Sequence, residues 1–397
     1  NSIVSGANYN TVVGDEAGTA ISGGSGYTTA IGYAAGAAIS TAGKNTLIGG
    51  LSGNALITGN SNVAVGYNSL TSDTLGDRNV AIGNQTLEAQ NFTSSTDSYN
   101  VAVGFHAGLA VTTGTQNTLI GSLAGDALGI AYSNVAVGFQ ALTTDVNGRS
   151  STAIGTQALY AQNYSSSTHS YNTAVGYTAG VAVTIGIRNT LVGAAAGDAI
   201  QDADENEAFG YAALSANVLG SGSVAVGSFA LNLQNPASAV TMYNTAVGNG
   251  AGGAVTTGVQ NTLIGGLAGD ALQAVHDTTA VGYLALSAAT VGGNTAVGSE
   301  AFENSTTGNS NVAMGIQAGR FVTTADNTTF IGANAGKGIT GTKLTGNNNT
   351  AVGKDAGLLL QGAAAENCIF GALAGDAITT GGENCLFGMG AGGSIQT

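Results

Sequence analysis

The residues best suited to bind a metal ion lie in one acidic turn. Asp202, Asp204 and Asn206 alternate along the chain, which is the oxygen spacing that begins a calcium-binding loop. That loop also needs Gly and Glu further on, where this chain has Glu207 and Ala213. A polar turn whose charges limit aggregation is the alternative interpretation. Ca²⁺ is therefore the one cofactor that the sequence suggests.

Other chemically capable side chains recur at regular intervals. Asp126, Asp198 and Asp270 are evenly spaced along the chain and could bind cations, although solvated turn acids are the simpler interpretation. Cys368 and Cys385 occupy equivalent places in two adjacent repeats. We expect them to be stacked neighbours, and a reduced pair in the core is favoured over a disulfide.

Groups that could perform catalysis are sparse. His106, His169 and His276 occur singly, without the spacing of metal ligands. The chain has no Gly-x-Ser-x-Gly elbow and no Gly-Lys-Ser/Thr phosphate loop. Paired carboxylates could still meet between chains, as in glycan hydrolases carried on fibres. We expect a protein that is not an enzyme.

Composition excludes several classes of partner and fold. Of 397 residues, 65 are Gly, 1 is Pro and 8% are charged, unlike an ordinary globular domain. An apolar content of 43% argues against disorder. A net charge of −14 argues against nucleic acid and anionic membrane as partners. No run of apolar residues is long enough to insert into a bilayer.

A repeat covers nearly the whole chain. The motif Asn-Thr/Val-small-Val/Ile-Gly occurs 22 times, and 14 of the 21 spacings between its glycines equal 17. Four spacings are 21, two are 18 and one is 16. Glycines 32, 104, 176 and 248 recur at a constant interval of 72, so four coils form a higher repeat.

This period predicts an all-β fold, a parallel β-solenoid (β-roll) of about 22 coils. Gly, Asn, Thr and Val are poor helix formers, and stacked coils pair their backbones with both neighbours. We expect two strands per coil, for example Asn172 to Val175 and Val181 to Thr184. The recurring Asn should form an amide ladder. The whole chain, 1–397, is expected to be one elongated solenoid domain, with an irregular coil at 1–13 and a C-terminal end at 389–397.

Each strand is apolar on both faces. We expect the residue before Gly, such as Val103 or Ile120, to face the coil interior, and the residue two before Gly, such as Ala102 or Leu119, to face outward. The outward face then needs another surface, most simply the same face of identical chains. The periodic Leu would set the register between them. A homotrimeric rod, with two identical chains as partners, satisfies this need.

The longer coils insert extra residues at one place, and insertions in a solenoid project from one face that is often the binding face. An aromatic ring beside hydroxyl and amide groups suits sugar binding; a spacer or a clasp between chains is the alternative. The candidate receptor-binding residues are Phe92, Thr93, Tyr164, Ser165, Asn235 and Asn347.

Aromatic residues follow the motif Gly in alternate coils. Interdigitation of rings with small residues is the favoured interpretation, and an exposed strip for stacking against carbohydrate is the alternative. These residues are Tyr33, Tyr67, Phe105, Phe139, Tyr177, Tyr211 and Tyr283.

The repeat resembles the YadA-like head repeat of trimeric autotransporter adhesins, as in Asn79-Val80-Ala81-Ile82-Gly83 and Asn134-Val135-Ala136-Val137-Gly138. It is also similar to repeats of phage tail-fibre-like proteins, as in the segment from Asn172 to Gly180. The adhesin repeat is usually shorter, near 14 residues.

The resemblance implies a trimer of β-rolls that acts as an extracellular attachment fibre, on a virion or a bacterial surface, toward a host-cell glycan or protein. A structural shaft or capsid-associated filament without a receptor site is the alternative. Ice binding is a third possibility, disfavoured because Thr-x-Thr rows are not the repeated feature.

Overall fold

The computed structural model describes residues 9–22 and 26–396. It is all-β, with no helix among these residues, and it confirms a parallel β-solenoid of about 22 turns at a spacing of about 17 residues. The chain divides into two compact units, residues 1–202 and 203–397. Of the irregular N-terminal coil expected at 1–13, residues 1–8 lie outside the described part, and Thr11–Val13 form strand β1.

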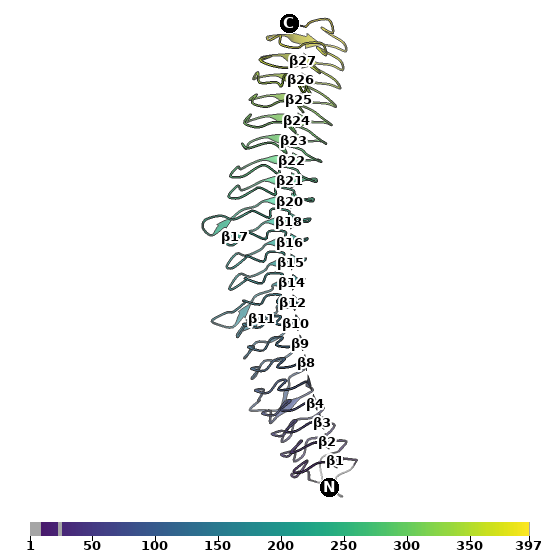
Figure 1. Cartoon of the computed structure of the whole chain (residues 1–397), viewed down its shortest axis with the longest axis vertical. Helices are drawn as coiled ribbons and strands as arrows, with labels where there is room; N and C mark the ends of the chain where they lie inside the picture. Colours follow the sequence, from purple (N-terminus) through teal and green to yellow (C-terminus); the bar gives the residue numbers. More distant parts are fainter. Residues whose placement is uncertain (1–8, 23–25, 397) are drawn as a thin grey trace. The chain divides into compact units, whose positions relative to one another are not determined.

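The first unit contains one parallel sheet in which each coil contributes one three-residue strand, paired in register with the next coil. Figure 1 shows these strands stacked one above another. They are β1 (Thr11–Val13), β2 (Thr29–Ile31), β3 (Thr46–Ile48), β4 (Val63–Val65), β6 (Val80–Ile82), β8 (Val101–Val103), β9 (Thr118–Ile120), β10 (Val135–Val137), β12 (Thr152–Ile154), β14 (Thr173–Val175) and β15 (Thr190–Val192).

The second unit repeats this arrangement, again with parallel pairing between successive coils. Its strands are β16 (Glu207–Phe209), β18 (Val224–Val226), β20 (Thr245–Val247), β21 (Thr262–Ile264), β22 (Thr279–Val281), β23 (Thr295–Val297), β24 (Val312–Met314), β25 (Thr329–Ile331), β26 (Thr350–Val352), β27 (Cys368–Phe370) and β28 (Cys385–Phe387).

Each coil has one strand in this sheet, and the second strand predicted at Val181 to Thr184 is wrong. That segment belongs to a series of tight turns. Thr178 and Gly180, two and four residues after the motif Gly, both have positive φ, 53° and 58°. Such residues reverse the chain direction repeatedly, so this side of the coil cannot extend into a strand.

The two faces of each strand are the reverse of those predicted. In β9, Leu119 is fully buried inside the coil, whereas Ile120 is 39% exposed. The same pattern of a buried middle residue flanked by outward side chains holds in nearly every strand of the sheet. The coil interior is narrow, so Ala is the usual middle residue and the larger Val and Ile lie outside.

The four-coil repeat reflects complementary volumes inside the coil. Leu119 reaches the space beside Gly108 and Gly125, where an added Cβ would lie 2.7 Å and 2.8 Å from its methyl groups. In two successive coils whose strand has Ala in the middle, those of β10 and β12, Leu142 and Leu159 fill the core from the turn instead. The periodic Leu therefore sets the packing of the coil interior, and the prediction that it sets the register between chains is wrong.

The predicted amide ladder is confirmed, and it lies inside the coil. Asn117 is fully buried. Its Oδ1 accepts the Asn134 backbone N–H at 3.1 Å, and its Nδ2 donates to the Ala131 carbonyl at 3.0 Å. The same Nδ2 lies 3.2 Å from Asn100 Oδ1. Each Asn thus satisfies backbone groups of its own turn and of the next coil, which buried polar groups require.

Candidate functional site

The insertions of three longer coils add a short second bridge beside the main sheet. In the first unit, β5 (Gly76–Asp77) pairs with β7 (Thr96–Asp97), and β11 (Gly148–Arg149) pairs with β13 (Thr168–His169). In the second unit, β17 (Gly220–Ser221) pairs with β19 (Val240–Thr241). Figure 1 shows loops that project from the side of the coils at β11 and β17, the strands against which the inserted segments place β13 and β19. The insertions therefore do project, as solenoid geometry predicts.

The two aromatic residues expected to bind a receptor point inward. Phe92 is 5% exposed and Tyr164 is 4% exposed. The Tyr164 hydroxyl donates to the Gly186 carbonyl at 2.7 Å. Neither ring can stack against an external sugar in this conformation, which corrects the expectation for both. The four polar candidates are exposed, namely Thr93, Ser165, Asn235 and Asn347.

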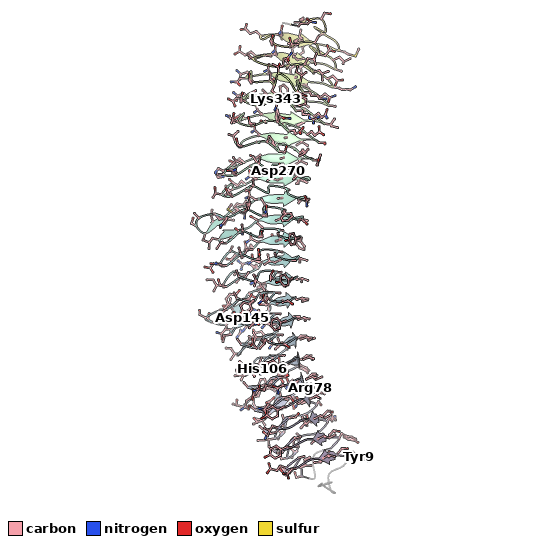
Figure 2. All side chains as sticks on the ribbon, in the orientation of Figure 1. Tyr9, Arg78, His106, Asp145, Asp270 and Lys343 are labelled. Atoms are coloured by element: carbon pink, nitrogen blue, oxygen red, sulfur yellow. The ribbon has the colours of Figure 1, made fainter. Side chains whose placement is uncertain are left out.

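A buried carboxyl anchors each insertion of the first unit. Asp145 accepts the Gly148 backbone N–H at 2.8 Å and the Gln162 Nε2–H at 2.6 Å. Asp73 makes the matching contacts one four-coil repeat earlier, with Gly76 and Gln90. Burial raises the pKa of both carboxyl groups above the usual range for Asp, and these hydrogen bonds oppose the rise. Figure 2 shows Asp145 within its coil.

In the second unit an uncharged side chain anchors the insertion. Asn217 stands where the first unit has Asp145, and its Oδ1 accepts the Gly220 backbone N–H at 3.0 Å. Gln234 donates instead to Ser223 Oγ at 3.1 Å. The first unit already contains the corresponding acceptor, because Gln162 also donates to Ser151 Oγ at 2.8 Å. An amide can therefore replace the carboxyl at position 145.

Asp145→Asn should flatten the pH dependence of stability. The native pKa of Asp145 is raised above the unfolded value, so ionisation is costlier in the folded chain, and its penalty grows as pH rises through the native pKa. The variant cannot ionise there. At pH 7 we expect the melting temperature of the variant to equal or exceed that of the wild type. The gain in the free energy of unfolding should be at most about 1 kcal/mol and should disappear near pH 3.

Thermal unfolding followed by circular dichroism between pH 3 and pH 8 measures this effect. The matched control is Asp277→Asn, which makes the same substitution at an exposed turn position. Equal slopes for Asp145→Asn and the wild type would contradict the assignment. The assignment would also be contradicted if the stability of the variant, measured relative to the wild type, were lower at pH 7 than at pH 3.

The outward face of the main sheet is a continuous apolar surface in each unit. The column directly before the motif Gly is Val or Ile in most coils and Phe or Met in the others. The column three residues before that Gly is mostly Thr or Val, with Cys in the last two coils. Ile82, Ile120 and Ile154 are each more than a third exposed. Glu207 is the one carboxylate at an outward position of the main sheet in the described chain, and partial burial raises its pKa. Extended apolar surfaces of this kind mark interaction sites.

The aromatic residues after the motif Gly flank this surface. Tyr33, Tyr67, Phe105, Phe139, Tyr177, Tyr211 and Tyr283 are all about half exposed. In two coils the ring leans toward the Gly of the preceding coil: a Cβ at Gly50 would lie 3.5 Å from the Tyr67 ring, and one at Gly266 would lie 3.6 Å from the Tyr283 ring. The interdigitation of rings with small residues is present there, and the rings keep one open side.

The candidate calcium ligands have other bonds. The Asn206 amide belongs to the buried ladder, where Nδ2 donates to the Gly220 carbonyl at 3.0 Å and Oδ1 accepts the Ser223 backbone N–H at 3.1 Å. In the first unit, Asp202 Oδ1 accepts a hydrogen bond from Thr184 at 2.6 Å. Within residues 9–22 and 26–396, no group of three or more His, Cys, Asp or Glu side chains is placed to hold a metal ion.

The three periodic aspartates are partly buried. One carboxyl oxygen each of Asp126, Asp198 and Asp270 is enclosed and has no hydrogen-bond partner within the described chain. Partial burial raises the pKa of all three. They are four coils apart, so about 19 Å separates successive carboxyls of one unit. They therefore cannot share a cation.

The two cysteines are stacked neighbours, as predicted, but they lie outside the core. Cys368 in β27 pairs in register with Cys385 in β28, and both thiols are free. Cys385 is exposed, since these positions belong to the outward face. The Phe370 and Phe387 rings lie beside them and stack at 5.1 Å. Desolvation, with a smaller effect of Cys385, raises the pKa of Cys368.

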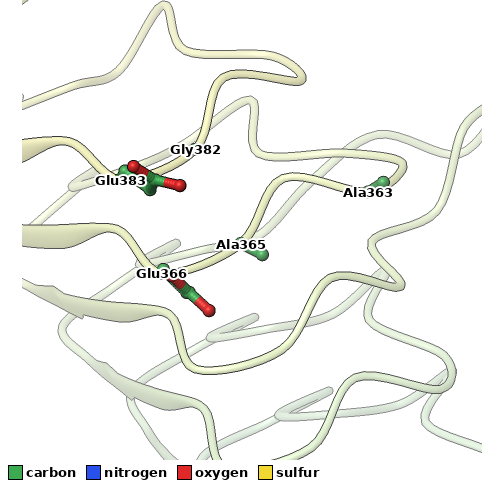
Figure 3. Close-up of a pocket in the computed structure, with 5 residues that line it drawn as sticks. All are labelled: Ala363, Ala365, Glu366, Gly382 and Glu383. Carbon is green, nitrogen blue, oxygen red and sulfur yellow. The ribbon is translucent and has the colours of Figure 1, made fainter.

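The second unit also has a shallow hollow near its C-terminal end. It measures about 340 Å³ and is lined by Ala363, Ala365, Glu366, Gly382 and Glu383. Figure 3 shows the two glutamates, which come from successive coils, at one side of this hollow. The two carboxylates repel an anionic ligand. The hollow also lacks the large apolar and aromatic side chains that line most small-molecule sites.

A cluster of basic and aromatic side chains was not predicted from the sequence. Tyr132, Arg149, Ser150, His169 and Tyr171 meet beside the β11–β13 bridge. Its signal in the sequence is a substitution within the four-coil repeat, since His169 stands where the preceding repeat has Asp97.

In comparisons with known proteins, the chain matches no family model and no curated sequence. No helix in the described part is long and apolar enough to cross a bilayer.

Proposed function

We propose that the chain is a segment of a homotrimeric attachment fibre, exposed outside the cell on a virion or a bacterial surface. The observation that carries this proposal is the outward face of the main sheet. In each unit its Val and Ile side chains recur in most coils, with Phe at three outward positions of the second unit, and many of them remain more than a third exposed. A water-soluble chain would not keep so long an apolar strip uncovered.

Sister copies of the same chain are the partner that fits this strip best. The strip repeats every coil, about 4.8 Å, and only a partner with the same rise can match it rung by rung. Its strands contain almost no charge, so a partner needs no complementary ions. Three chains around one axis give each strip a neighbour on both sides.

Adhesion is supported by the projecting insertions and their exposed polar side chains. Thr93 and Ser165 occupy equivalent places in two of these loops. The inward position of Phe92 and Tyr164 favours the second candidate, a structural shaft in which the insertions stiffen the coil and bind no receptor. Both candidates share the trimer and differ only in whether the loops bind anything.

Two measurements on the full chain test these proposals. Sedimentation equilibrium should give three chains per particle at micromolar concentration, and a monomer would contradict both candidates. Fluorescently labelled chain should then bind host cells or a glycan array. Removal of residues 93–96 and 165–168 should abolish that binding if the chain is an adhesin. Trimers that bind neither cells nor glycans would favour the shaft.

A further inference from the structure

The cluster beside β11 and β13 leaves a guanidinium group available for a ligand. Arg149 lies over the Tyr132 ring, with Cζ 4.2 Å from its centroid, and its Nη1–H donates to the Tyr132 hydroxyl at 3.1 Å. Its buried Nε–H has no partner, and no carboxylate of the described residues forms an ion pair with it. The Nε–H is enclosed, so a ligand can reach only the Nη1 and Nη2 end of this guanidinium, where Tyr132 uses one Nη1–H.

His169 and Tyr171 complete the wall of the site. His169 pairs with Arg149 across the short bridge, and its Nδ1 lies 3.2 Å from Ser150 Oγ. Its ring stacks on Tyr171 at 5.4 Å and meets Tyr132 edge-on at 5.9 Å. Tyr171 is 57% exposed. The half-exposed Tyr171 ring is thus joined through His169 to the cationic group and to several hydrogen-bonding atoms.

The preceding repeat of the same unit shows what such an arrangement binds. There, Arg78 forms an ion pair with Asp97 and lies 5.7 Å from the Tyr99 ring centroid, and the Tyr99 hydroxyl donates to the same carboxylate at 3.3 Å. Tyr171 corresponds to Tyr99, and His169 corresponds to Asp97. The later site therefore keeps an arginine and a tyrosine, although the arginine has moved by one residue, and it lacks the internal carboxylate.

We propose that the cluster of Tyr132, Arg149, His169 and Tyr171 binds the carboxylate of an acidic sugar, of the uronic or sialic acid class, on a surface glycan. This deepens the proposed attachment function and rests on it. The planar guanidinium binds a carboxylate in bidentate fashion, and the exposed Tyr171 ring offers a face to the apolar side of a sugar ring. The Ser150 and Tyr132 hydroxyls hold His169 in place, with Ser150 Oγ near its Nδ1 and the Tyr132 hydroxyl 3.5 Å from its Nε2.

The electrostatics of the chain favour a sparsely charged ligand. The net charge of −14 repels polyanions at long range, whereas a glycan with isolated carboxylates presents one charge to one arginine. The equivalent bridge of the second unit has Ser221 and Thr241 in place of Arg149 and His169. It has no cationic group and serves as a natural negative control.

Isothermal titration of the full chain with trigalacturonic acid tests the proposal, and sialyllactose provides the sialic acid arm. We expect one site per chain for at least one of these sugars, and binding about tenfold weaker or lost for the methyl ester of the uronate or the neutral lactose. Equal binding of the charged and neutral forms would overturn the proposal. So would binding of neither acid.

Two variants locate the site. Arg149→Gln should weaken binding about tenfold or more, whereas Arg78→Gln, whose arginine already pairs with Asp97, should leave it unchanged. His169→Asp should also abolish binding, because it restores the internal carboxylate of the earlier repeat. Wild-type affinity in Arg149→Gln, with circular dichroism unchanged, would refute the assignment.

The result separates this proposal from the attachment proposal. All four residues come from coils of one chain, so the site can bind its sugar even if the chain is a monomer, which would reject only the fibre. Conversely, a trimer that attaches to cells, and does so equally well after Arg149→Gln, would reject only the acidic sugar site. Loss of cell attachment together with sugar binding in that variant supports both.

Discussion

Gly121→Ala should unfold several coils of the first unit. Gly121 has φ of +133°, a conformation that is almost restricted to glycine. An added Cβ would also lie 2.5 Å from the carbonyl oxygen of Gly138 in the next coil. That neighbour is backbone, held in the ladder by its own hydrogen bonds, and cannot move aside. We expect a loss of about 4 kcal/mol, from backbone strain and overpacking together.

A series of glycines separates these two causes. Gly293 has φ of +74° and no atom within 4 Å of an added Cβ, so Gly293→Ala should cost about 1 kcal/mol from backbone strain alone. Gly341 has neither a positive φ nor a near neighbour, and Gly341→Ala should change stability by less than about 0.5 kcal/mol. Thermal melting and limited proteolysis measure the three effects. A similar cost at all three positions would contradict the stacking argument.

The motif glycines explain why the fold could be predicted from the sequence. Each occupies the same place in its coil, and carbonyl oxygens of successive coils lie against them. A side chain there would separate the coils, so glycine must recur at the period of the stack. A glycine that recurs at a fixed period therefore indicates stacked coils. Because each coil contacts only its neighbours, successive coils have similar sequences.

The orientation of the strands was predicted wrongly, although the sequence contains the information. Side chains alternate along a strand, so Asn117 and Leu119 must share a face, and Thr118 and Ile120 must share the other. The amide of Asn117 satisfies backbone groups and is buried, which places Leu119 inside. Hydrophobicity alone could not decide, because both faces are apolar. The recurring polar residue was the better guide.

The inward turn of Phe92 and Tyr164 could not be predicted from their residue types. An aromatic ring in a polar loop is equally suited to a sugar or to the space beneath the loop. The Asp145–Gln162 pair anchors the loop, and the Tyr164 hydroxyl is bonded to the Gly186 carbonyl inside the coil. The signal of this pair is the recurrence of Asp73 as Asp145, and of Gln90 as Gln162, one four-coil repeat later. That pattern shows a structural repeat and does not reveal which side of the loop the ring takes.

The outward face offers the largest expected effect on assembly. Ile120→Glu combined with Ile154→Glu should convert the proposed trimer to monomers. These side chains are 39% and 38% exposed in the single chain, so covering the rest contributes about 0.5–1 kcal/mol for each residue. An unpaired carboxylate buried there would cost several kcal/mol for each chain. Summed over two substituted coils in each of three chains, this penalty exceeds the stabilisation from apolar burial in the adjacent coils.

Sedimentation equilibrium of the double variant measures the result, and circular dichroism checks the coil. The single chain should keep its melting temperature in dilute solution, because both positions already face water there. Val146→Glu is the matched control: Val146 is 39% exposed as well, but it lies in a turn away from the main sheet, so its variant should remain trimeric. A double variant that stays trimeric would place the interface on another face. If Val146→Glu dissociates the chains and the double variant does not, the interface between chains lies at the turns and not on the outward face of the main sheet.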